Sequence, residues 1–279
     1  MIKYLFLLCS ISIFSQSAWV KTKGKLYTQL SYNTIPNYST IFNQKGTELS
    51  TSRLINDQTI QLYAEYGLSA KTTLITAIPF KRLTTSSTVA ETTFPLTIKE
   101  GEMNTLGNVS FAVRHKIPHK KYAIATQLQV NFPTAAYNAN TGLRSGIDAY
   151  SLMPSVSLGK GKNNLFFQSS FGLIFRTNKY SNGLFFNLEG GKKFYKQLWV
   201  IPFINIVDSF ADGNIQEPIN NFETFLNLDK AQYGGFGIKL IEEIKPNFGV
   251  TAAVGGAFFA HLEAKQLSLN VGLYYKIKK

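Results

Sequence analysis

Three histidines are the side chains of this sequence that could serve as the base of a Ser–His or Cys–His nucleophile. His115 and His119 lie in and beside an expected short turn, and His261 has Glu263 two positions on but no evident serine partner. No spacing of His, Cys, Asp or Glu matches a metal site, and no glycine-rich phosphate loop occurs. The residues therefore predict a protein that is not an enzyme and that binds no metal or cofactor.

The first residues have the three-part layout of a secretory signal peptide. Lys3 supplies a basic start, and an apolar stretch followed by small residues comes after it. We expect residues 1–17 to be removed, with cleavage after Ala18 as the near alternative, which leaves 18–279 as a single transmembrane domain. The single cysteine, Cys9, falls in the removed part, so we expect a mature chain without a disulfide or a thiol nucleophile.

Apolar and polar residues alternate with a period of two along the whole chain, which predicts strands with one apolar face. The last segment, 266–277, shows the pattern most clearly. The segments are close to ten residues long, as expected for tilted strands that cross a membrane. Twelve segments show the pattern: 24–33, 58–66, 72–81, 106–115, 121–132, 149–158, 164–176, 183–190, 197–207, 230–240, 247–255 and 266–277.

The connections between these segments are long and short in turn. The short ones are 67–71, 116–120, 159–163, 191–196 and 241–246. The long ones are 34–57, 82–105, 133–148, 177–182, 208–229 and 256–265. Outer-membrane barrels have short periplasmic turns and long outer loops, whereas a soluble β-sandwich has no reason to separate its connections this way. We therefore predict an all-β, antiparallel transmembrane β-barrel of about 12 strands in the outer membrane of a Gram-negative bacterium.

The basic residues that give the net charge of +13 gather on the side of the short turns. We expect no nucleic-acid partner, because the lysines are scattered in turns without arginines or stacking aromatic residues. Contact with anionic headgroups of outer-membrane lipids in the inner leaflet is the expected role. The lysines concerned are Lys21, Lys23, Lys25, Lys71, Lys116, Lys120, Lys121, Lys160, Lys162, Lys192, Lys193, Lys196, Lys245, Lys276, Lys278 and Lys279, against Glu242 and Glu243.

The strand parity also identifies the side chains that should line the lumen. Those we expect to face inward are Gln29, Gln61, Tyr63, Gln127, Gln129, Gln168, Asn187, Trp199, Phe203, Asn205 and Asn270. Four inward charges, Glu65, Arg114, Glu189 and Lys239, stand just before short turns and should form a floor at the inner mouth. We predict that Glu65 pairs with Arg114 and Glu189 with Lys239, because an unpaired charge in a narrow lumen is costly.

Three prolines, Pro79, Pro154 and Pro202, fall inside expected strands. Proline has no backbone N–H to donate to the ladder, so each position requires a bulge or an interruption. Such a site is either a local irregularity without a role or a break in the wall through which a hydrophobic molecule can pass sideways into the bilayer.

Short motifs in the first half of the chain carry a family resemblance that spans most of the chain. They are Trp19 followed by Gly24-Lys25-Leu26-Tyr27, Gly67-Leu68-Ser69 leading to Pro79, and Leu106-Gly107-Asn108-Val109-Ser110 before Arg114. The chain resembles the transporters of the meta-pathway of phenol degradation, which are distantly similar to long-chain fatty-acid channels. The resemblance implies an outer-membrane barrel that transports small hydrophobic compounds, and it implies no site residues. The C-terminus departs from the common ending by lacking a terminal phenylalanine, although the barrel-assembly machinery remains an expected partner during biogenesis.

The leading hypothesis is a porin-like barrel for passive transport of a small hydrophobic or aromatic cargo. The alternative is a barrel that transports nothing and whose extracellular loops bind a partner protein or a glycan. A third hypothesis, an outer-membrane lipid hydrolase, lacks a plausible catalytic triad. A continuous lumen would favour transport, whereas a lumen packed shut would favour binding.

Overall fold

The computed structural model describes residues 17–43, 47–93, 96–195, 197–211 and 213–277. The expected signal peptide lies outside the described residues except for Ser17. In the part of the chain that is described, no helix is both long and apolar enough to cross a membrane.

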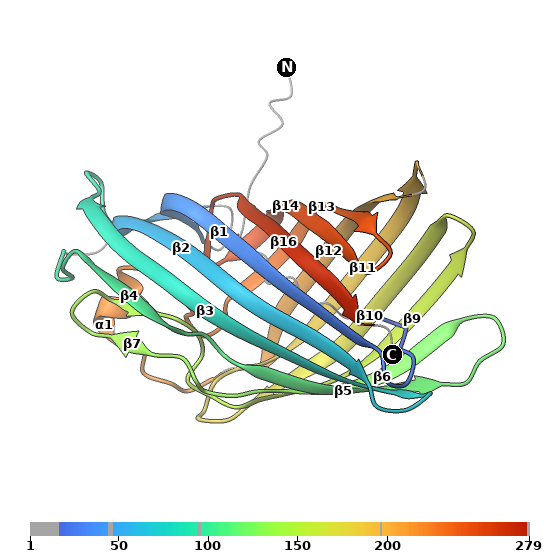
Figure 1. Ribbon diagram of the computed structural model, residues 1–279. Coiled ribbons are helices and arrows are strands. Elements are labelled where there is room, and N and C mark those ends of the chain that lie inside the picture. The colour runs from blue at the N-terminus through green and yellow to red at the C-terminus, as the bar shows by residue number, and fades with distance from the viewer. Residues whose placement is uncertain (1–16, 44–46, 94–95, 196, 212, 278–279) are drawn as a thin grey trace, which may run out of the picture.

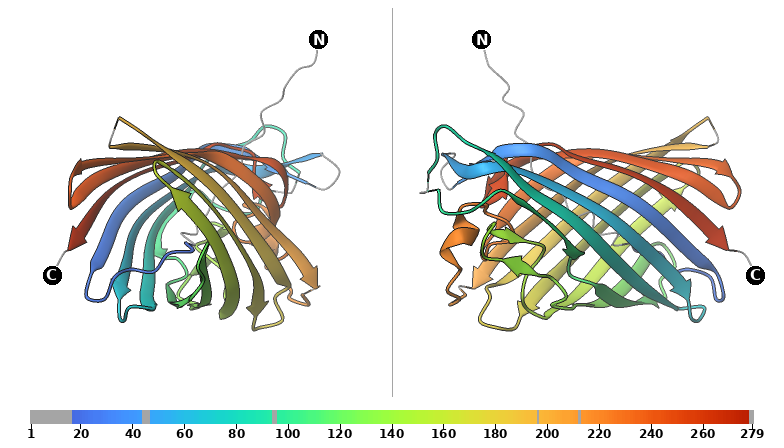
Figure 2. Two further views of the ribbon diagram at one scale, coloured as in Figure 1. Left: turned by 90° about the vertical axis from the view of Figure 1, so that its right-hand side faces the viewer. Right: turned by 60° about the vertical axis from the view of Figure 1, so that its left-hand side comes forward.

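The strands form a closed antiparallel ring of 12 positions (Figures 1 and 2). Successive strands pair with each other, and β1 pairs with both β2 and β16, which closes the ring. Two positions hold two strands each, because β4 and β5 both pair with β3, and β15 and β16 both pair with β1. The ring strands are β1 (Leu26–Phe42), β2 (Glu48–Gly67), β3 (Thr72–Thr88), β4 (Gly101–Leu106), β5 (Ser110–Ile117), β6 (Ala123–Asn131), β9 (Ser151–Lys162), β10 (Leu165–Arg176), β11 (Asn182–Phe194), β12 (Leu198–Ala211), β13 (Gln232–Lys245), β14 (Phe248–His261), β15 (Glu263–Ala264) and β16 (Ser268–Ile277).

The outer surface of the ring is apolar, as strand β16 illustrates. Its odd-numbered residues, such as Val271 and Leu273, are exposed hydrophobic side chains, whereas Asn270 and Tyr274 are buried on the inner face. A continuous apolar surface of this kind is stable against lipid rather than water. All twelve predicted segments coincide with positions of the ring, so the predicted barrel architecture is confirmed.

The five short connections lie together on one rim, at the right-hand side of Figure 1. They span 68–71, 118–122, 163–164, 195–197 and 246–247. The predicted turns 159–163, 191–196 and 241–246 were too long, because β9 runs on to Lys162, β11 to Phe194 and β13 to Lys245. The sequence pattern missed these strand ends because their residues lie at the membrane edge. There both faces of a strand carry polar side chains, so apolar and polar residues no longer alternate.

Several predicted outer loops are partly strand. The predicted loops 34–57, 82–105, 208–229 and 256–265 were too long, because β1 continues to Phe42, β2 begins at Glu48, β3 continues to Thr88, β12 continues to Ala211 and β14 continues to His261. These extensions project beyond the apolar band, where the outward face of a strand no longer meets lipid, while inward side chains such as Ile41 and Leu83 are buried in an apolar cluster inside this end of the barrel. Residues 84–88, Thr-Thr-Ser-Ser-Thr, show how the alternation disappears there although the pairing persists.

Both ends of the ring are filled by irregular segments. At the outer end, a hairpin of β7 (Tyr137–Asn138) and β8 (Leu143–Arg144) and the short helix α1 (Ile219–Phe222) fold between the strand extensions (Figure 2, right). At the inner end, residues 17–25 run across the mouth (Figure 2, left). The outer filling has an apolar core made of Tyr38, Ile41, Ile55, Leu83, Leu143, Phe225, Leu226, Leu228 and Ala264.

Candidate functional site

Glu65 and Arg114 form a buried ion pair at the inner end of the lumen. Nη1 of Arg114 lies 2.9 Å from Oε1 of Glu65, and their side chains are 1% and 6% exposed. Nζ of Lys21 lies 2.8 Å from the other carboxylate oxygen, and the Tyr63 hydroxyl donates to Oε1 at 2.8 Å. A buried carboxylate without partners would be costly, and here two cations and a hydroxyl compensate for its lost hydration.

A second ion pair lies at the same end of the barrel. Nζ of Lys239 on β13 is 2.7 Å from Oε1 of Glu189 on β11. The amide of Gln168 on β10 donates to Oε2 of Glu189 at 2.7 Å. The structure therefore brings together each of the two pairs expected from the sequence, and the narrowing of the passage by these pairs stays a prediction.

The N-terminal segment completes this floor, which the sequence did not indicate. Nη1 of Arg114 donates to the main-chain oxygen of Trp19 at 3.2 Å, and the amide of Ala18 donates to Oε1 of Gln168 at 3.3 Å. Lys21 was expected in the basic rim, but its ion pair with Glu65 places it inside the mouth. No signal in the sequence reveals this, because an irregular segment has no periodicity to read.

The ring of Trp19 anchors the segment against the barrel wall. Its centroid lies 6.0 Å from that of Phe166 in an edge-on arrangement, and Phe166 lies 5.4 Å from the ring of Trp199. Gly159 provides the room, because a Cβ at this position would lie 2.7 Å from the Trp19 ring. Trp19, Phe166 and Trp199 thus form a cluster of aromatic rings at the inner end of this side of the barrel.

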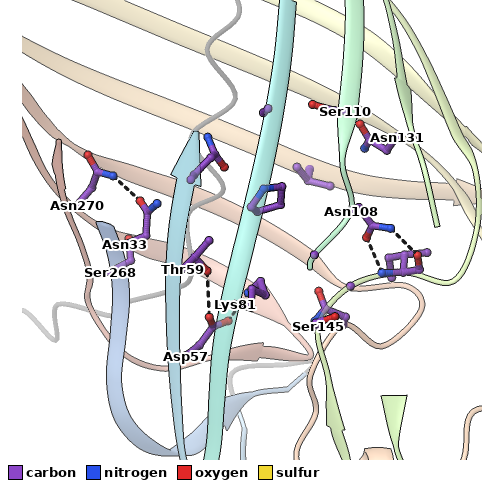
Figure 3. Close-up of a pocket in the computed structure, with 18 of the residues that line it drawn as sticks. Asn33, Asp57, Thr59, Lys81, Asn108, Ser110, Asn131, Ser145, Ser268 and Asn270 are labelled. Atoms are coloured by element: carbon purple, nitrogen blue, oxygen red, sulfur yellow. Dashed lines mark hydrogen bonds and ion pairs between the residues drawn. The ribbon is translucent and has the colours of Figure 1, made fainter. Parts of the chain in front are cut away.

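A cavity of about 500 Å³ lies in the lumen between the floor and the outer filling. One side of it is polar, as Figure 3 shows. Asn270 donates to Asn33 at 2.5 Å, and the carboxylate of Asp57 accepts from the Thr59 hydroxyl at 3.3 Å and from Nζ of Lys81 at 2.6 Å. Asp57 and Lys81 neutralise each other in an ion pair. This wall therefore offers hydrogen-bonding groups to a ligand, but no unpaired charge from these two residues.

The other side of the cavity is apolar. Phe225, Leu226 and Leu228 of the outer filling line it together with Ile35 and Tyr38 of β1. The same residues belong to or pack against the apolar core of the filling. A molecule in this cavity would therefore contact hydrocarbon on one side and amides or hydroxyls on the other, which is a common arrangement in small-molecule sites.

The residues predicted to line the lumen divide into two groups. Those that line the cavity are Gln29, Gln61, Tyr63, Gln127, Gln129 and Asn270. Those that do not line it are Gln168, Asn187, Trp199, Phe203 and Asn205, which lie on β10, β11 and β12. Asn187 and Phe203 are buried, because this part of the barrel is packed with side chains. The odd or even position of a residue along a strand predicts whether its side chain points inward. It does not predict where other side chains already occupy the lumen.

Pro79 faces the cavity at an interruption of the wall. The register of β3 changes between Ala77, which pairs with Ser110 of β5, and Phe80, which pairs with Leu106 of β4. In between, the amide of Gly107 donates to the oxygen of Pro79 at 2.9 Å. Gly107 and the neighbouring Asn108 both line the cavity, so the lumen reaches this interruption.

The side chain of Asn108 fastens the interruption to an outer loop. Its Nδ2 donates to the oxygens of Phe132 and Ile147, each at 2.8 Å, and its Oδ1 accepts from the amide of Ile147 at 2.7 Å. Asn108 therefore replaces, with side-chain bonds, the ladder bonds that the wall lacks at this point.

The other two prolines face the lipid. Pro154 pairs with Leu128 on β6, but the paired rows of β9 and β10 are interrupted between Ser155 and Leu152. Pro202 pairs with Ile238 on β13, and the rows of β11 and β12 are interrupted beside it. The register continues unchanged across both gaps, so these prolines weaken the ladder without bending the wall.

Buried polar side chains hold the outer filling in place. Oε2 of Glu223 accepts from the amide of Thr97 at 3.0 Å, which ties two outer loops together. Nη1 of Arg144 lies 2.9 Å from Oε2 of Glu217 and donates to the Tyr180 hydroxyl at 3.0 Å. Burial raises the pKa of Glu217, and this effect outweighs the opposing attraction of Arg144.

The described residues offer no arrangement for metal chemistry. No group of three or more His, Cys, Asp or Glu side chains within them could hold a metal ion. His115, at the inner end of β5, exchanges a hydrogen bond with the Thr72 hydroxyl at 3.1 Å on the outward face.

The fold and its surface define the class of this protein. A closed ring with an apolar exterior and a cavity inside is an outer-membrane β-barrel of the channel type. The chain belongs to the family described as "Putative MetA-pathway of phenol degradation", whose model matches residues 46–261. No curated protein matches the sequence.

Solved structures of similar fold are outer-membrane barrels. An outer membrane channel from Pseudomonas putida F1 has a TM-score of 0.73 at 12% identity, covering 95% of this chain and 100% of that chain. The NanC porin has a TM-score of 0.51 at 10% identity, covering 90% and 100%. The translocator domain of the autotransporter NalP from Neisseria meningitidis has a TM-score of 0.50 at 10% identity, covering 91% and 89%. At these identities the likeness shows the fold alone.

Proposed function

We propose that this barrel carries a small hydrophobic or aromatic molecule passively across the outer membrane and does not alter it chemically. The observation that carries the proposal is the cavity of about 500 Å³ with one polar and one apolar side. A space of this size suits a small organic molecule, whose apolar part gains by leaving water. Two of the lysines that line it, Lys81 and Lys239, are neutralised by ion pairs with Asp57 and Glu189, which supports a neutral cargo over an anion.

Segments of the chain lie across both ends of the barrel, which supports a route through the side wall over a straight pore along the barrel axis. The outer filling and the N-terminal segment lie above and below the cavity. The interruption beside Pro79 supports a sideways path, because Gly107 and Asn108 line the cavity at that place in the wall. An apolar molecule leaving through the wall would enter the bilayer without crossing water.

Cargo binding can be tested with fluorobenzene and the purified protein, followed by fluorine NMR. Ala77 lines the cavity, whereas the next residue, Ile78, projects from the outer surface. Ala77→Phe should fill the cavity and weaken binding several-fold, while Ile78→Phe, which adds a ring on the other face of the same strand, should bind like the wild type. If the wild-type protein fails to bind fluorobenzene, or if both variants bind equally well, the proposed cargo site is wrong.

The alternative role is binding of a partner protein or glycan by the outer loops. The buried network around Glu223 and Arg144 favours this alternative, because it fixes the outer loops in one conformation that a partner could recognise. A wild-type protein that takes up no small solute and conducts no current would support this alternative.

A further inference from the structure

Three lysines project from the outer wall at the rim of the short turns. Leu165 of β10 pairs with Lys162 of β9 on one side and with Lys192 of β11 on the other. Phe167 of β10 pairs with Lys160 of β9. Residues paired across neighbouring strands project from the same face. The lysines therefore share the lipid-facing surface with Leu165 and Phe167, which are 58% and 51% exposed.

The spacing lets these lysines act on one ligand. Strands β9 and β11 flank β10, so Lys162 and Lys192 start roughly 10 Å apart at the usual strand spacing. Each carries its ammonium on a flexible four-carbon stem. The two stems can therefore converge on a single anion above Leu165, with Lys160 one row further along β9.

The charges of this cluster are not neutralised by the protein. No ion pair among the described residues includes Lys160, Lys162 or Lys192. Nζ of Lys160 lies 5.3 Å from the centre of the Tyr122 ring, and Nζ of Lys192 lies 5.1 Å from that of Phe194. Aromatic faces steady an ammonium without cancelling its charge, so both groups remain able to bind an anion.

An apolar stripe continues from the cluster up the wall. Phe171 and Phe175 follow Leu165 and Phe167 along β10, and all four are exposed. The surface thus has a cationic end at the membrane edge and a hydrocarbon stripe beyond it. These are the two features that a phospholipid with a negatively charged head requires.

We propose that Lys160, Lys162 and Lys192 bind the phosphate of an anionic phospholipid of the inner leaflet, with its acyl chains along β10. A zwitterionic lipid fits the cluster less well, because its own ammonium offsets the phosphate charge. This site lies on the outside of the barrel and is independent of the cavity and of any cargo.

The rim supplies a matched control. Lys23, Lys25 and Lys71 are also exposed at this end, but they lie in the N-terminal segment and in the turn between β2 and β3. They add the same charge to the rim without standing in a lipid-facing row. A triple Lys→Gln change at these positions therefore removes equal charge and leaves the proposed site intact.

The test is native mass spectrometry of the full barrel released from detergent micelles that contain phosphatidylglycerol or phosphatidylcholine. The wild-type protein should retain phosphatidylglycerol over phosphatidylcholine on the order of tenfold, given three cations at the membrane surface. K160Q/K162Q/K192Q should lose this preference, and K23Q/K25Q/K71Q should keep it. Each protein is first checked for a folded barrel by its altered mobility in unheated gels.

Two results would overturn the proposal. One is equal retention of the two lipids by the wild-type protein. The other is an equal loss in both triple variants, which would assign the preference to the general charge of the rim. A separate arm of the test uses glycerol 3-phosphate, which has the phosphate head without acyl chains. It should bind more weakly than the lipid. Equally tight binding would contradict the part of the proposal that places the acyl chains along β10.

Discussion

The guanidinium of Arg114 joins the carboxylate of Glu65 to the N-terminal segment. One of its nitrogens lies 2.9 Å from Glu65 and 3.2 Å from the main-chain oxygen of Trp19, and its Nε donates to Gln127 at 3.0 Å. One side chain therefore links β2, β5 and β6 with the segment that crosses the inner mouth. The floor and the segment should loosen together when this link is removed.

Arg114→Ala should raise single-channel conductance, because it frees Trp19 and removes a bulky side chain from the inner mouth. It should also destabilise the barrel by roughly 3 kcal/mol, since the buried carboxylate of Glu65 loses one of its two cations. Planar-bilayer recording and urea unfolding measure the two effects.

Arg82→Ala is the control for Arg114→Ala. Arg82 pairs with Glu102 at 2.8 Å on the exposed surface, so its loss should leave both conductance and stability close to wild type. Unchanged conductance in Arg114→Ala would remove the floor from the transport mechanism.

Gly159 tests the N-terminal segment without touching a charge. A Cβ at Gly159 would lie 2.7 Å from the ring of Trp19, whereas the nearest atom to a Cβ at Gly161 is 3.7 Å away. Gly159→Val should displace the segment and raise conductance, and Gly161→Val should behave like the wild type. Equal conductance in the two variants would show that the segment does not limit the passage.

The sequence predicts the ring because inward and outward residues alternate along each strand. It predicts the floor because the four inward charges stand at the same small number of residues before their predicted turns. Glu65 and Arg114 stand on the same face at the same depth, and a narrow lumen favours their pairing. The N-terminal segment and the outer filling could not be predicted, because their residues have no periodic neighbours. Phe225 of the filling, for example, is buried by long-range packing rather than by its position in a strand.

The outer filling should respond to pH through Glu217. Burial raises the pKa of this carboxyl above its ordinary value of 4.5, so its protonated form favours the closed filling. The stabilisation is fully present below the ordinary pKa and is lost as pH rises through the raised pKa. Arg144, Asp229, Tyr180 and Tyr137 face the same cluster.

Hydrogen exchange of residues 213–231 measures this response. Protection should fall between acidic and neutral pH in the wild-type protein and should change less in Glu217→Gln, whose side chain cannot ionise. A pH dependence of equal size in the variant would show that another group in the cluster is responsible.

Asn108→Ala should ease passage through the wall beside Pro79. The change removes the three bonds to Phe132 and Ile147 that fasten the interruption. We expect faster uptake of an apolar solute in vesicles and an unchanged rate in Asn104→Ala, which alters an exposed residue of β4. A slower or unchanged rate in Asn108→Ala would exclude this interruption as the exit.

The central claim is that the barrel moves a small apolar molecule past the outer leaflet. Its most direct test is the influx of radiolabelled toluene into vesicles with lipopolysaccharide in their outer leaflet, with sucrose as the polar comparison. Vesicles that contain the protein should take up toluene several-fold faster than empty ones and should show little added entry of sucrose. Equal toluene influx with and without the protein would contradict the account.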